Sequence, residues 1–486
     1  MPFNVALTGL RAASTDLEVT GNNVANASTI GFKKSSVQFG DLYANSFLSG
    51  SINQIGDGVR VQSIAQDFGQ GSVSGTENNL DLAINGQGFF ILDSGGERRY
   101  SRAGHFGVNN QGFIVNNTGM MIQGYTARDG VIGGALGPIH VSSENLAPRR
   151  TQDVMASLNL NSSSTILPQR INELTPGVDR VLTVTLADGS VSRLQISAAD
   201  TAADIANALN ALSAGIASHD GTTVTMEAGA VATEHLFDPT DPKTYNHTTS
   251  TTIYDSLGNA HVLSMYFIKE QSVEGSEKTP WTMHLQVNGQ DVGNGGYNLV
   301  FNSDGSLDAN LSDPVQVNNW VPRNADGTPN GATGPNGDPN SHFAIDVSRL
   351  TQYGSAFAVN DMQQDGFTTG RMSGLDVNND GVIFARYTNG QSKVIAQVAL
   401  ATFKDTDGLA SVGDTTWVET YLSGQPLIGT PGMAALGSIQ ANALEESNVD
   451  LSDQLVNLII AQRNYQANAK TIETANAVTQ TIINLR

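Results

Sequence analysis

The 486-residue chain contains no cysteine, so it has no disulfide bond, no thiolate nucleophile and no Cys-ligated zinc site. Only 15% of its residues are charged, against about a quarter in an average globular protein. No stretch approaches the ~20 apolar residues of a membrane-spanning helix, so we expect no membrane insertion. The first residues, MPFNVALTGLRAAS, lack a basic region and a continuous apolar run, so we expect no cleaved signal peptide.

The residues that are present indicate a protein of several domains rich in turns. Acidic residues exceed basic ones, and the net charge of −21 argues against nucleic-acid binding. At about 150 residues per domain, the length suggests roughly three domains. The 51 glycines, together with many Asn, Thr and Ser residues, favour short strands and turns over disorder.

A heptad pattern at the N-terminus predicts a helix over residues 3–24. Apolar or small residues recur at alternating steps of four and three, which is typical of a coiled-coil seam. Pro2 suits the first helical turn. The positions of the stripe are Phe3, Leu7, Leu10, Ser14, Leu17, Gly21 and Val24.

The last forty residues show the same pattern, with Asp450 or Ser452 as a possible cap. The stripe consists of Leu451, Leu455, Leu458, Gln462, Tyr465, Ala469 and Ile472, and it drifts to Ala475, Val478, Ile482 and Leu485. An amphipathic helix more often packs on the core of its own domain. Here the terminal positions and narrow stripes favour partners in other copies, because two helices cannot cover each other on all sides. We therefore expect termini that are loose in the single chain and ordered in an assembly.

Between the ends, the apolar pattern changes to the period of two that is typical of strands. Hairpins are predicted at 375–403, at 181–196 around Asp188-Gly189, and at 250–270 around Leu257-Gly258-Asn259. A short helix capped by Asp200 and a strand at 222–226 would complete an inserted ββαβ module. Residues 322–342 are rich in Pro, Gly, Asn and Asp and predict a surface loop.

The predicted fold class is α+β, mainly β. It combines a terminal coiled-coil bundle with nested, discontinuous β domains of barrel or sandwich type and the inserted ββαβ module. The predicted parts are a terminal helical polymerisation domain (1–26 and 440–486), an extended connector (27–71 and 433–439), an inner β domain (72–146 and 355–432), an outer β domain (147–165 and 236–354) and an outermost module (166–235).

Catalytic motifs are not found. The eight histidines are scattered without a paired metal-binding spacing. Gly86-Gln87-Gly88 lacks the third glycine of a dinucleotide fingerprint and reads as a tight turn between strands. Residues 376–381 resemble the start of a calcium loop, but Tyr387 stands where a bidentate Glu is required. We therefore predict no catalytic residue, no cofactor and no metal site. The 46 acidic residues still allow a pair of carboxylates that could act in acid–base catalysis, although no motif singles out such a pair.

Three segments carry a resemblance to a known family. They are NNVANASTIGFKKS at 22–35, NNLDLAINGQGFFIL at 78–92 and SNVDLSDQLVNLIIAQRNYQANAKTI at 447–472. The sequence thereby resembles the bacterial flagellar rod and hook proteins over roughly residues 1–145 and 355–486. The long middle part, which carries no such motif, is similar to that of a hook-type member rather than a shorter rod-type one.

The resemblance implies a structural subunit of a hollow, curved tube that joins rod to filament and acts as a universal joint. The terminal helices would form the innermost layer, and residues 27–71 would connect neighbouring subunits. Implied partners are other copies of the chain, rod proteins at the base, junction proteins at the tip, a hook cap and the flagellar type III export apparatus. The implied location is the extracellular flagellum, reached without a cleaved signal peptide.

The segment after the first helix is the predicted signature of the connector. Short polar side chains at a helix end can bond the backbone locally and direct the chain, although simple helix termination is the alternative. Gly31 should adopt a conformation that a larger residue could not, and Phe32 should anchor the connector. The signature residues are Asn22, Asn23, Asn26, Thr29, Gly31 and Phe32.

Two other functions stay open at this point. The chain could be another axial flagellar protein, such as a distal rod or hook–filament junction protein. It could also be a secreted adhesin, or an enzyme whose active module lies within residues 147–354.

Overall fold

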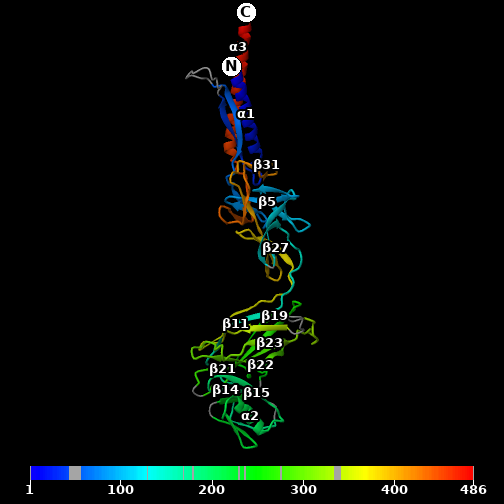
Figure 1. Ribbon diagram of the computed structural model, residues 1–486, viewed down its shortest axis with the longest axis vertical. Helices are drawn as coiled ribbons and strands as arrows, with labels where there is room; N and C mark the ends of the chain where they lie inside the picture. The colour runs from blue at the N-terminus through cyan, green and yellow to red at the C-terminus, as the bar shows by residue number, and fades with distance from the viewer. Residues whose placement is uncertain are drawn as a thin grey trace. The chain divides into compact units, whose positions relative to one another are not determined.

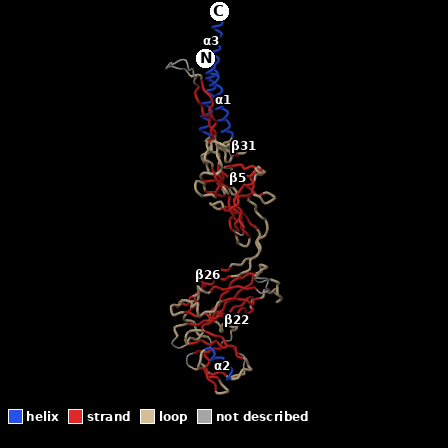
Figure 2. Tube along the Cα trace, viewed as in Figure 1, coloured by secondary structure: helices blue, strands red, loops and turns tan. Residues whose placement is uncertain are grey.

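The computed structural model describes residues 2–42, 56–128, 130–167, 169–177, 180–227, 230–234, 237–273, 276–332 and 341–484. The chain divides into two compact units, one made of residues 1–144 and 371–486 and the other of residues 145–370. The second unit is therefore inserted into the first. Both units consist mainly of strands (Figure 2).

The two terminal helices, α1 (Pro2–Ala25) and α3 (Leu451–Asn484), lie side by side in the first unit (Figure 1). They run antiparallel, since Gly9 lies against Asn468 whereas Asn23 donates to Gln454 Oε1 at 3.1 Å. Small side chains on α1 allow the two helices to approach closely, and the expectation that the termini are loose in the single chain stays a prediction. No helix of the described residues is both long and apolar enough to cross a membrane.

A hairpin of β1 (Ser35–Leu42) and β2 (Gly58–Gln66) packs on α1. The Val59 amide donates to Thr8 Oγ1 at 3.3 Å. Asn23 holds the other end, donating to the Ser35 carbonyl at 2.7 Å and accepting from the Ser35 amide at 2.9 Å. The predicted extended connector 27–71 thus contains a hairpin that packs on the chain's own helix, while residues 43–55 lie outside the described residues.

The rest of the first unit is built on one large antiparallel sheet, which has 13 strands among the described residues. Its strands are β5 (Phe89–Ser94), β6 (Glu97–Ser101), β7 (Phe106–Val108), β8 (Ile114–Asn116), β9 (Met121–Arg128), β10 (Val131–Pro138), β27 (Met372–Val377), β28 (Val382–Tyr387), β29 (Ser392–Val398), β30 (Leu400–Thr402), β31 (Ala410–Gly413), β32 (Thr416–Val418) and β33 (Leu427–Gly429). Two short pairs complete the unit: β3 (Val73–Gly75) with β35 (Ala443–Glu445), and β4 (Leu82–Asn85) with β34 (Ser438–Ala441). Phe89, Tyr100, Phe403 and Trp417 pack together in its core.

The second unit contains two sheets that share one apolar core. The first consists of β11 (Asp153–Asn161), β23 (Val315–Trp320), β24 (Ser341–Asp346), β25 (Thr351–Tyr353) and β26 (Ala358–Gln364). The second consists of β19 (His247–Tyr254), β20 (Ala260–Lys269), β21 (Thr279–Val287) and β22 (Gln290–Phe301). Leu158, Phe267 and Trp281, from both sheets, are fully buried in this core, as a sandwich requires.

The predicted boundary between the inner and outer β domains is wrong at the return of the chain. Residues 355–370 belong to the second unit and not to the first. The reason is long-range pairing: β26 runs antiparallel to β11, with Val154 opposite Gln364. Periodicity alone cannot reveal such a partner, about 200 residues away in the sequence.

The inserted module has two sheets and one helix rather than the predicted ββαβ unit. Its sheets are β12 (Gln169–Ile171), β14 (Arg180–Leu186), β15 (Val191–Ile196) and β18 (Ala230–Glu234), and β13 (Glu173–Leu174), β16 (Ala217–His219) and β17 (Val224–Met226). The strand predicted at 222–226 is β17, which pairs outside the main sheet; β18 pairs with β14 instead. The cap of α2 (Ala202–Leu212) is Thr201, not Asp200, because Thr201 and Asp204 form a reciprocal capping box.

The module contacts the adjoining sheet through a buried carboxylate. Glu270, which follows β20, accepts hydrogen bonds from Thr233 of the module at 3.1 Å and from Thr282 at 2.9 Å. Arg193 of the module donates to the Gly296 carbonyl. Burial raises the pKa of Glu270 above its usual value, although both threonines and Arg193 oppose this shift. The contact is therefore polar and sensitive to charge.

Glu270→Gln should stabilise the second unit increasingly as the pH rises. The folded carboxyl group holds its proton to higher pH than the unfolded one, so the wild type loses stability from about pH 4.5 upward. The neutral amide does not titrate. Urea denaturation of both proteins between pH 4 and pH 8 should show a difference in free energy of unfolding that grows with pH; a constant difference would contradict the argument.

Candidate functional site

α3 exposes large apolar side chains over more than half of its circumference. Asp450 begins the helix by accepting from the Ser452 amide at 2.8 Å and the Asp453 amide at 3.2 Å. Large apolar side chains exposed on an ordered helix are candidates for contact with another chain. Eight large side chains of α3 are 40% to 64% exposed: Leu451, Leu455, Val456, Ile459, Ile460, Tyr465, Val478 and Ile483. We call these residues the α3 face.

Only some residues of the predicted α3 stripe are covered by other parts of the chain. Leu458, Ala469 and Ile472 are half-buried, whereas Leu451, Leu455 and Tyr465 are exposed. Ala461, which lies off the stripe, is the fully buried residue. The predicted stripe did not include Val456, Ile459 and Ile460. Three consecutive apolar residues, Leu458-Ile459-Ile460, could have indicated an apolar surface wider than a coiled-coil seam. The Ile482 side chain and Leu485 lie outside the described residues.

On α1 the buried face is not the predicted stripe. Phe3 is exposed, and Leu7, Leu10, Leu17 and Val24 are only half-buried. The buried positions are Ala6, Ala12, Ala13, Thr20 and Asn23. Small side chains let the backbones of α3 and the β1–β2 hairpin approach α1, so its larger apolar groups stay partly uncovered.

The signature after α1 ends the helix and redirects the chain. Asn26 donates to the carbonyl and side-chain oxygens of Asn22, both at 3.0 Å, and Thr29 donates to Asn26 Oδ1 at 3.1 Å. Gly31 has φ +70°, and a Cβ there would lie 2.5 Å from the Ala103 nitrogen. Phe32 is only half-buried. Helix termination therefore accounts for Asn22 and Asn26, whereas Asn23 makes long-range contacts.

The residue that the sequence analysis missed is Lys33, whose side chain is fully buried. Its Nζ lies 2.6 Å from Glu445 Oε1, and both side chains are 0% exposed. Lys33 also donates to the Gly69 carbonyl at 2.7 Å, and Glu445 accepts from the Gly71 amide at 3.0 Å. The ion pair joins the segment after α1 to the segment before α3.

Arg102 completes this cluster from the large sheet. Its Nε lies 2.9 Å from Glu445 Oε2, and its remaining nitrogens donate to the carbonyls of Gly86 and Gly88 at 2.7 to 2.9 Å. Burial lowers the pKa of both Lys33 and Arg102, and the charge of Glu445 opposes that shift. We call Lys33, Arg102 and Glu445 the ionic clasp, because they connect both terminal segments to the β domain.

Glu445→Ala should destabilise the first unit by about 3–5 kcal/mol, because it leaves two buried cations without their counter-charge. Lys34→Ala is the control: it breaks the exposed Lys34–Asp67 pair and should cost less than about 1 kcal/mol. Hydrogen exchange of peptides spanning residues 443–445 reads the local opening free energy. Equal protection in the two variants would show that the clasp contributes nothing.

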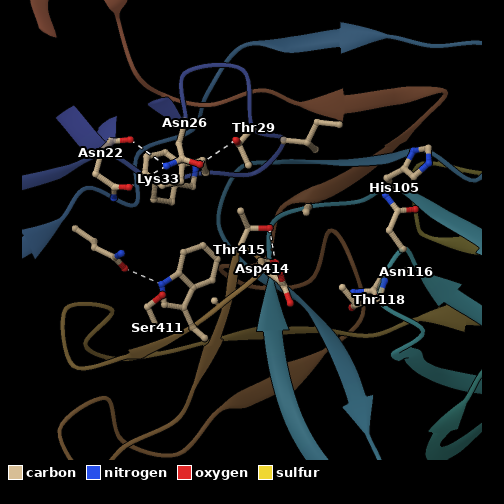
Figure 3. A pocket seen from close by; sticks show the side chains of 17 residues that line it. Asn22, Asn26, Thr29, Lys33, His105, Asn116, Thr118, Ser411, Asp414 and Thr415 are labelled. Atoms are coloured by element: carbon tan, nitrogen blue, oxygen red, sulfur yellow. Dashed lines mark hydrogen bonds between the residues drawn. The ribbon is translucent and has the colours of Figure 1, made fainter. Parts of the chain in front are cut away.

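A hollow of about 540 Å³ lies between the signature and the large sheet. Figure 3 shows Asn22, Asn26 and Thr29 on one side of it, His105, Asn116 and Thr118 on another, and the turn of Asp414 and Thr415 below. Its lining is mostly polar and uncharged. In the described part of the chain, no group of three or more His, Asp or Glu residues could hold a metal ion. The lining therefore offers mainly hydrogen-bonding groups, together with the rings of Phe32 and Trp417.

Family profiles match four parts of the chain. They are described as "Flagella basal body rod protein" (residues 3–33), "Flagellar hook protein FlgE/F/G D1 domain" (83–164), "Flagellar basal body protein FlaE D2 domain" (221–367) and "Flagellar basal body rod FlgEFG protein C-terminal" (440–485). The third match covers much of the middle part, in which the sequence analysis found no family motif.

Whole-length relatives decide the family. Flagellar hook protein FlgE of Salmonella typhimurium is 32% identical over 496 residues, and that of Escherichia coli is 32% identical over 493; each alignment covers 100% of both chains. The chain belongs to the flagellar hook protein family. FlgE of Borreliella burgdorferi is 30% identical over 498 residues, covering 99% of this chain and 98% of its own. A crystal structure of Helicobacter pylori flagellar hook protein FlgE2 aligns with 14% identity and a TM-score of 0.48, covering 76% of this chain and 100% of that one.

As a hook-family protein, the chain is a structural subunit of the bacterial flagellum. The two profiles at the chain ends correspond to α1 with the signature and to α3. The clasp residues Lys33 and Glu445 lie at the inner ends of these matches. Because family profiles match both ends of the chain, the terminal helices are the candidates for contacts between subunits.

Proposed function

We propose that the chain polymerises with copies of itself into the hollow, curved tube of the hook, which transmits torque from rod to filament as a universal joint. The observation that carries this proposal is the α3 face. About half of each of its large apolar side chains is exposed in the single chain, where water contact costs free energy. Helices of neighbouring copies would cover this face and form the innermost layer of the tube.

A universal joint must resist twisting and yield in bending, and the proposed layers divide these tasks. Apolar contacts between terminal helices and the ionic clasp would carry torsion, since the clasp joins these helices to the β domain by short charged contacts. The second unit and its module would form the outer layers. Wet, shallow contacts between polar outer surfaces can rearrange at small cost while the inner layer holds.

The proposed partners follow the order of the flagellum. Rod proteins would meet the tube at its base and junction proteins at its tip, while a cap and the flagellar type III export apparatus would serve assembly. The proposed location is outside the cell, reached through that export apparatus, and the proposed role is structural rather than catalytic. The lack of cysteine fits this route, because no disulfide bond has to form after export.

Ile459→Asp with Ile460→Asp should abolish polymer formation and leave the monomer folded. Both side chains are about half-exposed, so their replacement removes little core packing but places charge on the α3 face. Sedimentation of the full chain over a concentration series, with electron microscopy of the pellet, measures the result. Asn457→Asp with Asn464→Asp adds the same charge to exposed positions of α3 and should retain polymer. Normal tubes from the isoleucine variant would refute the assignment.

Removal of residues 166–235 should change curvature or bending stiffness without abolishing assembly, since the α3 face and the clasp remain. Because the deletion strips Thr233 and Arg193 from Glu270, the shortened chain should carry Glu270→Gln. Tube curvature in electron micrographs is the measurement, with full-length Glu270→Gln as the control. Complete loss of polymer in the shortened chain alone would contradict the layered division of roles.

A further inference from the structure

An exposed loop of the first unit presents two apolar side chains that no described residue covers. Tyr421 is 99% exposed and Leu422 is 74% exposed. Tyrosine is among the residues that contribute most binding energy at protein interfaces. We call residues 420–424, which include this pair, the Tyr421 knob.

The knob is held in place by its own hydrogen bonds. Ser423 is fully buried; its hydroxyl accepts from the Thr420 amide at 2.9 Å and donates to the Thr420 carbonyl at 3.0 Å. Thr420 Oγ1 donates to the Gly408 carbonyl at 2.5 Å. Just before the loop, the Tyr100 hydroxyl donates to Glu419 Oε2 at 2.6 Å. An ordered loop loses little conformational entropy when it binds, which is the property of a pre-organised anchor.

The hollow beside the signature has the chemistry that suits a tyrosine. Its polar lining includes Asn22, Asn26 and Asn116, and its apolar lining includes Phe32 and Trp417. A phenol ring needs this combination, because its body is apolar and its hydroxyl needs a hydrogen-bond partner. The volume of about 540 Å³ exceeds what one tyrosine side chain fills.

Backbone strain at the rim of the hollow is a separate observation. Asp414 and Thr415 both have positive φ, at 51° and 52°. Such a two-residue turn favours Asn-Gly, and a β-branched residue at positive φ is an outlier. Strained residues of this kind gather at sites of function, where the surrounding structure maintains them.

Knob and hollow are connected by one hairpin. The turn of the β31–β32 hairpin at Asp414 and Thr415 lines the hollow, as do Ser411 and Trp417, and its open end, where Ala410 pairs with Val418, leads into the knob. Tyr421 is 99% exposed, so the knob does not occupy the hollow of its own chain and is free to enter that of the next copy. A head-to-tail contact of this kind does not close on itself and generates a helical array.

From these observations we infer that the Tyr421 knob of one copy inserts into the signature hollow of a second copy of this chain. This inference rests on the proposed polymerisation and adds a specific contact between β domains to that of the terminal helices. It also gives the signature a second role, since Asn22, Asn26 and Phe32 line the hollow in addition to ending α1.

Alanine variants of the full chain test how much the knob contributes to the free energy of polymerisation. Tyr421→Ala and Leu422→Ala should each raise the critical concentration for sedimentable polymer by about tenfold or more, without changing the monomer's circular dichroism. Leu427→Ala is the matched control, because Leu427 is 67% exposed in the same unit but lies outside the knob. Equal effects of Leu422→Ala and Leu427→Ala, or unchanged polymer with Tyr421→Ala, would overturn the inference.

Disulfide formation between introduced cysteines tests whether the knob of one copy lies at the hollow of the next. Because the chain has no native cysteine, only the introduced residues can form the crosslink. Gln425→Cys, an exposed position beside the knob that leaves Tyr421 in place, with Asn117→Cys, at the hollow, should give a ladder of crosslinked species when oxidised polymer is run on a non-reducing gel. Gln425→Cys with Glu97→Cys, at the exposed start of β6 outside the hollow, should give none. A missing ladder for the first pair, or equal ladders for both, would overturn the inference.

The outcomes also separate this inference from the proposed function. If the wild-type chain forms no tubes at any concentration, the proposed function fails and the knob contact fails with it. If the wild type forms tubes and the Tyr421 variants do so equally well, only the knob contact is refuted.

Discussion

Three charges buried in the first unit connect parts of the chain that are far apart in sequence. Glu445 meets Lys33 at 2.6 Å and Arg102 at 2.9 Å, with Lys33 and Glu445 wholly removed from water. Buried charges are tolerated only when pairing and hydrogen bonds replace hydration, and here glycine amides and carbonyls complete the shell. This requirement fixes the segments that follow α1 and precede α3 against the β domain, so the direction of the helices depends on it.

The two units of the chain use different kinds of contact. In the first unit, short charged contacts and close packing of small residues hold the helices and hairpin together. In the second unit, an apolar sandwich core bears an inserted module whose contact includes the buried Glu270. A buried carboxylate stabilises less than an apolar contact of the same size but specifies geometry more narrowly.

Exposed apolar groups distinguish this chain from a protein that functions alone. The α3 face and the Tyr421 knob present large side chains to water on ordered elements, one a helix and the other a loop fixed by a buried serine. Monomeric proteins usually cover such surface. In a subunit of a polymer, the uncovered surface supplies the free energy of assembly, and its position on the chain determines which contacts form.

Local pattern in the sequence determined the elements of the structure. The heptad spacing predicted helices over 3–24 and from 451 onward, and the turns at Asp188-Gly189 and Leu257-Gly258-Asn259 predicted hairpins that the structure contains. Tertiary structure decided which face of α1 is buried, where β26 pairs and that Lys33 lies inside. Lys33 and Glu445 are 412 positions apart, and no periodicity records a partner at that distance. Helix and turn preferences act over a few residues, whereas burial and charge pairing depend on the folded chain as a whole.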